Sequence, residues 1–175
     1  MIAVISGTNR PRSTTRRVAD FYLQYLAAHH APATLVDLAD LPADFTTTAL
    51  YGNVGQNPAF NALAARAAAA SKLVFIVPEY NYSFPGVLKA FIDGLPYPGG
   101  IRYKKAALVG LAAGAQGGAV ALSHLTDVLH YLGTTVLPVQ PRLAFINQHF
   151  SREGEFTQPL YAQLLAEQAQ ALLAF

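Results

Sequence analysis

Three polar turns of this sequence carry residue types suited to an anionic, aromatic ligand. The first follows the apolar run of residues 2–5 and precedes apolar residues that recur at helical spacing. Hydroxyls, guanidinium groups and the free N–H groups of a helix start are the donors that a phosphate dianion prefers. The donors of this turn are Thr8, Arg10, Arg12, Ser13, Thr14, Thr15 and Arg16. They are equally typical of an ordinary N-cap with solvated arginines, and the sequence leaves both interpretations open.

The second turn follows a buried apolar run and combines a stiff backbone with aromatic surface. Two prolines restrict the chain, and the tyrosine and phenylalanine rings could cover a flat ligand. The turn reads Pro78, Glu79, Tyr80, Asn81, Tyr82, Ser83, Phe84, Pro85 and Gly86. Because aromatic residues also mark interfaces, a loop packed on a neighbouring segment or a dimer partner is the alternative. We expect Glu79 to cap backbone amides or to pair with a neighbouring chain rather than to act as an acid.

The third turn is the glycine-rich segment Gly114, Ala115, Gln116, Gly117 and Gly118. Three glycines in five residues let a backbone approach a planar ligand, and they also simply turn a chain into its next helix. This turn therefore indicates a ligand site only in combination with the other two turns.

Composition and missing motifs exclude several classes of function. The chain has no cysteine, so it has no disulfide, thiolate metal site or cysteine nucleophile, and a redox role would need a cofactor. No Gly-x-Gly-x-x-Gly or Gly-x-x-x-x-Gly-Lys-Ser/Thr motif occurs, which disfavours a dinucleotide fold and a P-loop and leaves a monophosphate. Four of the 12 Lys and Arg residues lie within residues 10–17, a local basic cluster rather than a nucleic-acid track.

The sequence also lacks a metal-ligand pattern and a membrane-spanning segment. The five histidines show no metal-ligand spacing with acids, so we interpret them as structural or solvated and expect no metal. No apolar stretch approaches the length of a membrane span and no leader pattern opens the chain, so we expect no membrane association and a cytoplasmic protein.

The elements that position the three turns alternate between strands and helices. We predict strands at residues 2–5, 34–36, 72–78, 106–112 and 134–137. We predict helices after the first turn and at residues 58–70, 86–93, 118–132 and 160–173, with a surface loop at 40–57. This alternation is typical of one α/β domain, residues 1–175, with helices on both faces of a five-stranded parallel sheet of flavodoxin-like order 2-1-3-4-5. Ligands of such sheets bind at the carboxyl ends of the strands, where the three turns lie.

The motifs of these turns resemble a known family. Gly-Thr-Asn-Arg-Pro-x-Ser, Pro-Glu-Tyr-Asn-x-Ser-x-Pro-Gly-x-Leu-Lys and Gly-x-x-Gly-Gly look like the NADPH-dependent FMN reductases, which include quinone, azo-dye and chromate reductases. The resemblance implies an enzyme that passes hydride from NADPH (or NADH) through flavin mononucleotide (FMN) to a small acceptor. That acceptor would be a quinone, an azo compound, a free flavin or a metal oxyanion. It also implies a homodimer or homotetramer with the flavin near the subunit interface.

The resemblance further assigns residues to parts of the flavin. It implies that Thr8, Arg10, Ser13 and Thr15 hold the phosphate. It implies that the ring lies along Pro78, Glu79, Tyr80, Asn81, Tyr82 and Ser83 and against Gly114, Gln116 and Gly117. No general base is expected, because the protein's task is stacking and orientation, with backbone groups of Tyr80, Asn81 and Ser83 near flavin N5.

A flavodoxin-type electron carrier or a flavin-storage protein without NAD(P)H turnover is the alternative function. Such carriers are usually strongly acidic so that they dock on basic partners, whereas this chain has a net charge of +2. The charge therefore favours the enzyme, and turnover with NADPH separates the two.

Overall fold

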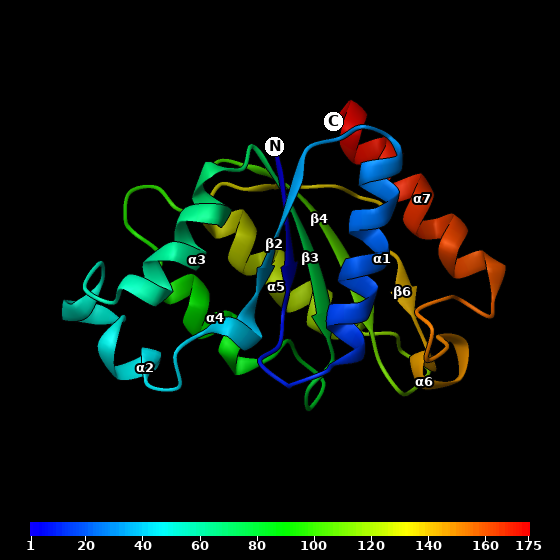
Figure 1. The fold of residues 1–175 in the computed structure, drawn as a ribbon, viewed down its shortest axis with the longest axis horizontal. Coiled ribbons are helices and arrows are strands. Elements are labelled where there is room, and N and C mark those ends of the chain that lie inside the picture. The colour runs from blue at the N-terminus through cyan, green and yellow to red at the C-terminus, as the bar shows by residue number, and fades with distance from the viewer.

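The computed structural model, which describes residues 1–175, is built around a parallel sheet (Figure 1). Its strands are β1 (Ile2–Ser6), β2 (Ala33–Asp37), β3 (Lys72–Pro78), β4 (Lys105–Leu111), β5 (Thr135–Val136) and β6 (Arg142–Leu143). The order β2-β1-β3-β4-β5 agrees with the predicted flavodoxin-like order, and every pairing is parallel.

The edge of the sheet next to β4 differs from the prediction of one strand at residues 134–137. Two short strands share it: β5 pairs with the first two residues of β4, and β6 pairs with the last two. Pro138 and Pro141 lie between them and lack the N–H group that a continuous strand would donate. The sheet therefore has six strands rather than five, and β6 extends its edge toward the carboxyl ends of the strands.

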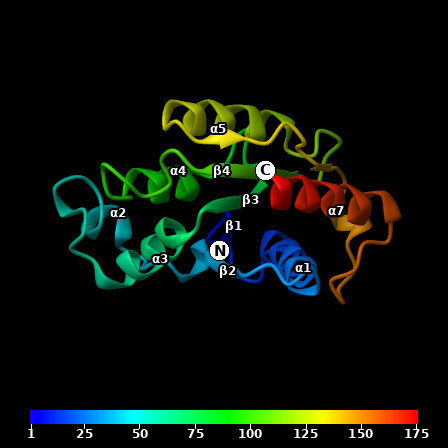
Figure 2. The ribbon, with the colours of Figure 1, turned by 90° about the horizontal axis from the view of Figure 1, so that it is seen from above.

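Helices cover both faces of the sheet (Figure 2). They are α1 (Thr14–Ala28), α2 (Phe45–Thr48), α3 (Pro58–Ala69), α4 (Gly86–Asp93), α5 (Ala119–Tyr131), α6 (Ile146–His149) and α7 (Pro159–Ala174), with short 3₁₀ turns η1 (Leu38–Asp40) and η2 (Tyr51–Asn53). Helices α3, α4 and α5 cover one face, while α1 and α7 cover the other. The predicted helices are confirmed with ends that agree to within a residue.

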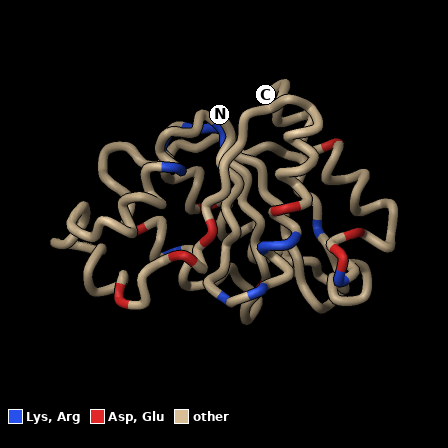
Figure 3. The backbone as a smooth tube through the Cα atoms, in the orientation of Figure 1, with Lys and Arg blue, Asp and Glu red and all other residues tan.

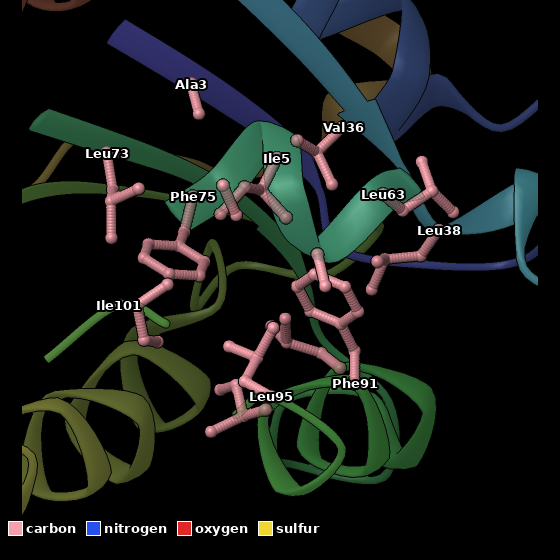
Figure 4. Close-up of a cluster of buried hydrophobic side chains, with 14 of the residues drawn as sticks. Ala3, Ile5, Val36, Leu38, Leu63, Leu73, Phe75, Phe91, Leu95 and Ile101 are labelled. Carbon is pink, nitrogen blue, oxygen red and sulfur yellow. The ribbon is translucent and has the colours of Figure 1, made fainter. Parts of the chain in front are cut away.

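The strands supply two hydrophobic cores by alternation. In β1, Ala3 and Ile5 pack toward α3, α4 and α5, whereas Ile2 and Val4 pack toward α1 and α7. Figure 4 shows the first core, in which Phe75 of β3 lies near Ile5 of β1 and Ile101. Burial on both faces explains why these strands read as continuous apolar runs.

The segment at residues 40–57 is more ordered than the predicted surface loop. It forms α2 and η2, and Phe45 and Leu50 are buried in the first core. The ring of Phe45 stacks on that of Phe60, with centroids 5.9 Å apart. The buried side chains of Phe45 and Leu50 anchor the segment, and the surrounding threonines and glycines hid that apolar pattern in the sequence.

No helix in the chain has the length and apolar character needed to cross a bilayer.

Candidate functional site

The first turn is fixed where it leaves β1. Gly7 donates its N–H to the Ile76 carbonyl at 2.9 Å, and a Cβ on Gly7 would lie 2.8 Å from that oxygen. Only glycine lets the turn pass this close to β3. At the other end of the turn, the Ser13 hydroxyl caps α1 by accepting from Arg16 N–H at 3.1 Å. The next two N–H groups, those of Thr14 and Thr15, have no acceptor in the protein, so the start of α1 offers free donors to an anion.

A hydrogen bond joins the first turn to the second. The Thr8 hydroxyl lies 2.7 Å from the Tyr80 hydroxyl, and it also accepts from Arg10 N–H at 3.2 Å. Thr8 is only 1% exposed, so its side of this contact is buried, whereas Tyr80 is partly open to solvent. The structure thus brings together two turns that are separated by about seventy residues in the chain.

The three arginines predicted in the first turn divide into two groups. Arg10 and Arg12 are exposed at the carboxyl edge of the sheet, where Figure 3 shows positive charge on the loop between β1 and α1. Arg16 instead pairs with Asp37 at 2.8 Å and with Asp20 at 3.0 Å. Hydrogen bonds to Asp37 and then to Asp20 raise the pKa of Arg16 above its ordinary value. The expectation that the Arg16 guanidinium is free for a phosphate is therefore wrong, because two carboxylates already hold it.

The second turn is tight and conformationally costly. Tyr80 N–H donates to the Ser83 carbonyl at 2.8 Å, and Ser83 N–H donates to the Tyr80 carbonyl at 3.1 Å. Between them Asn81 and Tyr82 have φ angles of 49° and 67°. This left-handed conformation costs a non-glycine residue about 1–2 kcal/mol, and asparagine tolerates it better than tyrosine. The N–H groups of Asn81 and Tyr82 have no acceptor in the protein, so the turn presents two free donors.

A cavity of about 300 Å³ lies between these turns. Six of the predicted site residues line it: Arg10, Ser13, Thr15, Pro78, Glu79 and Tyr80. The remaining predicted residues do not line it; they are Thr8, Asn81, Tyr82, Ser83, Gly114, Gln116 and Gly117. Ile146 and Asn147 of α6 also line it, and sequence reasoning missed both. Their signal was weak, because α6 is a single turn beyond a proline-interrupted edge strand.

Glu79 does not cap backbone amides of its own chain, although the sequence led us to expect this role. Its carboxylate caps no backbone amide, and its buried Oε2 atom has no hydrogen-bond partner. An unpaired buried acceptor costs free energy unless a ligand donates to it. The N3–H of a flavin ring and the hydroxyls of its ribityl chain are donors of this kind, so the residue fits such a ligand.

The third turn approaches the same edge of the sheet. Gly117 and Gly118 have φ angles of 57° and 82°, and a Cβ on Gly117 would lie 2.9 Å from the Arg142 carbonyl carbon. The Gly114 carbonyl accepts from Phe145 N–H at 3.1 Å, which ties the turn to the segment before α6. A Cβ on Gly114 would meet nothing within 4 Å, so the surface there is open to a ligand.

One histidine has a partner in the site. His124 of α5 places Nδ1 2.9 Å from the Ser83 hydroxyl. This link between α5 and the second turn is compatible with the structural role expected of His124, although the sequence did not indicate the partner.

Comparison with known proteins agrees with this geometry. The sequence model of the family described as NADPH-dependent FMN reductase matches residues 1–148. A 2-hydroxy-1,4-benzoquinone reductase from Burkholderia sp is 34% identical over 152 residues, which cover 81% of this chain and 76% of that protein. An NAD(P)H-dependent FMN reductase from Pseudomonas aeruginosa is 32% identical over 148 residues, which cover 81% of this chain and 78% of that protein.

A solved structure of a flavoenzyme is also similar to this chain. FerB, a flavoenzyme NAD(P)H:(acceptor) oxidoreductase from Paracoccus denitrificans, superposes with a TM-score of 0.78 at 26% identity. The match covers 99% of this chain and 94% of that one. The chain therefore belongs to the NADPH-dependent FMN reductase family, and it is an oxidoreductase with FMN and NAD(P)H as its cofactors.

Proposed function

We propose that this chain reduces a quinone with electrons from NAD(P)H, using FMN held between its first and second turns. When bound, FMN supplies the redox chemistry by accepting hydride from the nicotinamide and passing it on to the acceptor. The observation that carries the proposal is the Thr8–Tyr80 hydrogen bond beside the 300 Å³ cavity. It fastens a basic, donor-rich turn to an aromatic one, as a ligand with a phosphate at one end and a flat ring at the other requires.

In this proposal the phosphate of FMN binds at the start of α1. The free N–H groups of Thr14 and Thr15 and the dipole of the helix favour an anion there. The Ser13 hydroxyl accepts from Arg16 N–H and keeps its own proton to donate. Arg10, exposed and without a carboxylate partner, supplies the charge, while Thr8 and Thr15 contribute buried hydroxyls.

The flavin ring is proposed to bind along the second turn. The free N–H groups of Asn81 and Tyr82 can donate to its acceptor edge, and the orphaned Glu79 oxygen can accept from its N–H or from a ribityl hydroxyl. Donors in fixed positions stabilise negative charge that develops on a reduced ring. In the proposal, Gly114, Gln116 and Gly117 flank the other side of the ring, and the open space beside Gly114 leaves room for it.

A quinone is the proposed acceptor because the open side of the site is aromatic. Tyr82 is 56% exposed, and Phe145, whose N–H donates to Gly114, is 39% exposed. Such rings offer faces on which a flat, uncharged molecule stacks. The Burkholderia relative, named as a benzoquinone reductase, supports the same choice.

A homodimer or homotetramer is the proposed assembly. A concavity of about 580 Å³ lies between α4 and α5, and its lining includes no residue of the three turns. Tyr97 and Tyr131 line it and are 80% and 84% exposed, a degree of aromatic exposure that favours burial against a second copy. Light scattering tests the assembly, and a monomer at micromolar concentration would refute it.

We further propose that residues 1–175 act as one FMN-binding unit in the cytoplasm, where NADPH is regenerated. Cell fractionation tests the location, and recovery of the protein outside the cytoplasmic fraction would refute it.

Enzyme assay of the purified protein tests the function. The protein is expected to be yellow, to release FMN on denaturation and, without oxygen, to oxidise more than one equivalent of NADPH per FMN only when a benzoquinone is added. Bound FMN with no NADPH oxidation would instead support an electron carrier or a flavin store. Absence of FMN binding would refute the proposal altogether.

A further inference from the structure

The second turn is held in its conformation by few hydrogen bonds. Two successive left-handed residues, Asn81 and Tyr82, are closed by only the two backbone hydrogen bonds between Tyr80 and Ser83. The turn stands at the exposed end of β3, and Asn81 and Tyr82 are both exposed. Strained turns of this kind persist only when their surroundings hold them.

Two side-chain hydrogen bonds provide that support, one at each end of the turn. The Tyr80 hydroxyl bonds to Thr8 of the first turn, and the Ser83 hydroxyl bonds to His124 of α5. The first link belongs to the flavin site already described. The second lies outside the cavity, because neither Ser83 nor His124 lines it.

Helix α5 is a firm anchor for this second link. Its residues Ala121, Leu122, Leu125 and Leu129 are buried in the core, while the His124 side chain points away from the core and is exposed. The helix follows directly on the third turn, so its amino end and the second turn lie at the same edge of the sheet (Figure 1). A bond from His124 to Ser83 therefore ties the two walls proposed to flank the ring.

We propose that His124 is a positioning residue that holds the second turn to the third through the Ser83 hydroxyl. This inference rests on the proposed function, since the geometry it protects is that of the flavin ring. His124 touches neither cofactor nor substrate; it keeps the free N–H groups of Asn81 and Tyr82 in one arrangement. The imidazole is needed only as a hydrogen-bonding group, because it has no carboxylate partner and belongs to no metal cluster.

Asparagine is the matched replacement. The oxygen and nitrogen of its side-chain amide are bonded to Cγ, as Nδ1 of histidine is. His124→Asn can therefore keep the hydrogen bond to Ser83 while removing the imidazole ring. His124→Ala and Ser83→Ala each remove the bond, and the double variant removes nothing further. His130→Ala is the control, because His130 is exposed on the same helix and makes no side-chain hydrogen bond.

Two measurements on the full chain test the proposal. Without FMN, hydrogen exchange of the Tyr80 and Ser83 amides reports how often the turn opens. With FMN, fluorescence titration gives its dissociation constant, and visible circular dichroism reports the environment of the bound ring. Losing one hydrogen bond of ordinary strength corresponds to a change of about three- to tenfold.

The expected result is that His124→Ala and Ser83→Ala each speed exchange and weaken FMN binding by about three- to tenfold. The double variant should match the single ones, and His124→Asn and His130→Ala should stay near the unchanged protein. Unchanged exchange in His124→Ala, additive losses in the double variant, or failure of asparagine to rescue would overturn the positioning role. If the unchanged protein binds no FMN, the proposed function fails instead, and the exchange data still report on the link.

Discussion

The first and second turns meet over one cavity, yet they are held in place by different means. The first is fixed at its start by backbone, where Gly7 passes close to Ile76, and at its end by the Ser13 hydroxyl that caps α1. The second depends on side chains, because Tyr80 and Ser83 tie a left-handed pair of residues to distant segments. The proposed phosphate end of the site therefore begins at a close backbone approach inside the sheet, whereas the proposed ring end depends on side-chain hydrogen bonds that single substitutions can remove.

Breaking the first turn at its backbone should have the largest effect. Gly7→Ala would place a Cβ 2.8 Å from the Ile76 carbonyl oxygen, and neither backbone segment can move easily inside the sheet. We expect a loss of about 1–3 kcal/mol in the free energy of unfolding, measured by urea denaturation, together with loss of bound FMN. Gly52→Ala is the matched control, because a Cβ there meets nothing within 4 Å. Equal stability of the two variants would contradict the backbone argument.

Removing charge from the first turn should spare the fold and weaken the ligand. Arg10→Ala deletes an exposed guanidinium without a carboxylate partner, so stability should hardly change. The dissociation constant of FMN should rise about ten- to a hundredfold, as expected for a hydrogen bond to a charged group. Added salt should reduce the difference between the two proteins, because ions screen exposed charges. Arg66→Ala, exposed on α3, is the control, and unchanged FMN content in Arg10→Ala would disprove the phosphate role.

Cutting the link between the turns should have a smaller effect. Tyr80→Phe keeps the ring and removes only the hydroxyl that bonds to Thr8. FMN binding should weaken about three- to tenfold in a fluorescence titration. Thr8→Val should act through the same bond, although it also removes the acceptor for Arg10 N–H. If the double variant lost the full product of both effects, the two hydroxyls would not be acting through one contact.

Relieving strain in the second turn should have the smallest effect and the opposite sign. Tyr82→Asn places a residue that tolerates the left-handed conformation at φ 67°. We expect a gain of about 1 kcal/mol in the free energy of unfolding and slower turnover with a quinone, because an aromatic face is lost. Tyr51 has a φ of 57° and is 84% exposed far from the turns in sequence, so Tyr51→Asn should gain stability without changing turnover. Equal turnover of the two variants would remove Tyr82 from the acceptor site.

The contrast between the turns also explains what the sequence could predict. The strands and the larger helices follow from the hydrophobic pattern, because burial on both faces makes strands such as β3 continuous apolar runs and burial on one side gives helices a period of 3.6 residues. The strand order follows from the alternation of these elements. The capping of α1 by Ser13 follows from local chemistry, and so does the donor-rich start of that helix. Motifs in these segments were enough to indicate the family.

Features set by distant contacts were not predictable from local patterns. Arg16 looked like its neighbours Arg10 and Arg12, but Asp37 at the end of β2 holds it. The interrupted edge strand depends on pairing with β4, and the burial of Phe45 depends on its stacking against Phe60. The bond between His124 and Ser83 joins residues 41 positions apart, a contact for which one sequence gives no signal.

A crystal structure of the protein grown with FMN would show directly where the cofactor binds. We expect the phosphate at the start of α1, within hydrogen-bond distance of the Thr14 and Thr15 N–H groups and the Arg10 side chain. We expect the ring to lie against Asn81 and Tyr82. FMN bound elsewhere, for example in the concavity between α4 and α5, or a cavity closed by its own side chains with no flavin bound, would contradict this placement.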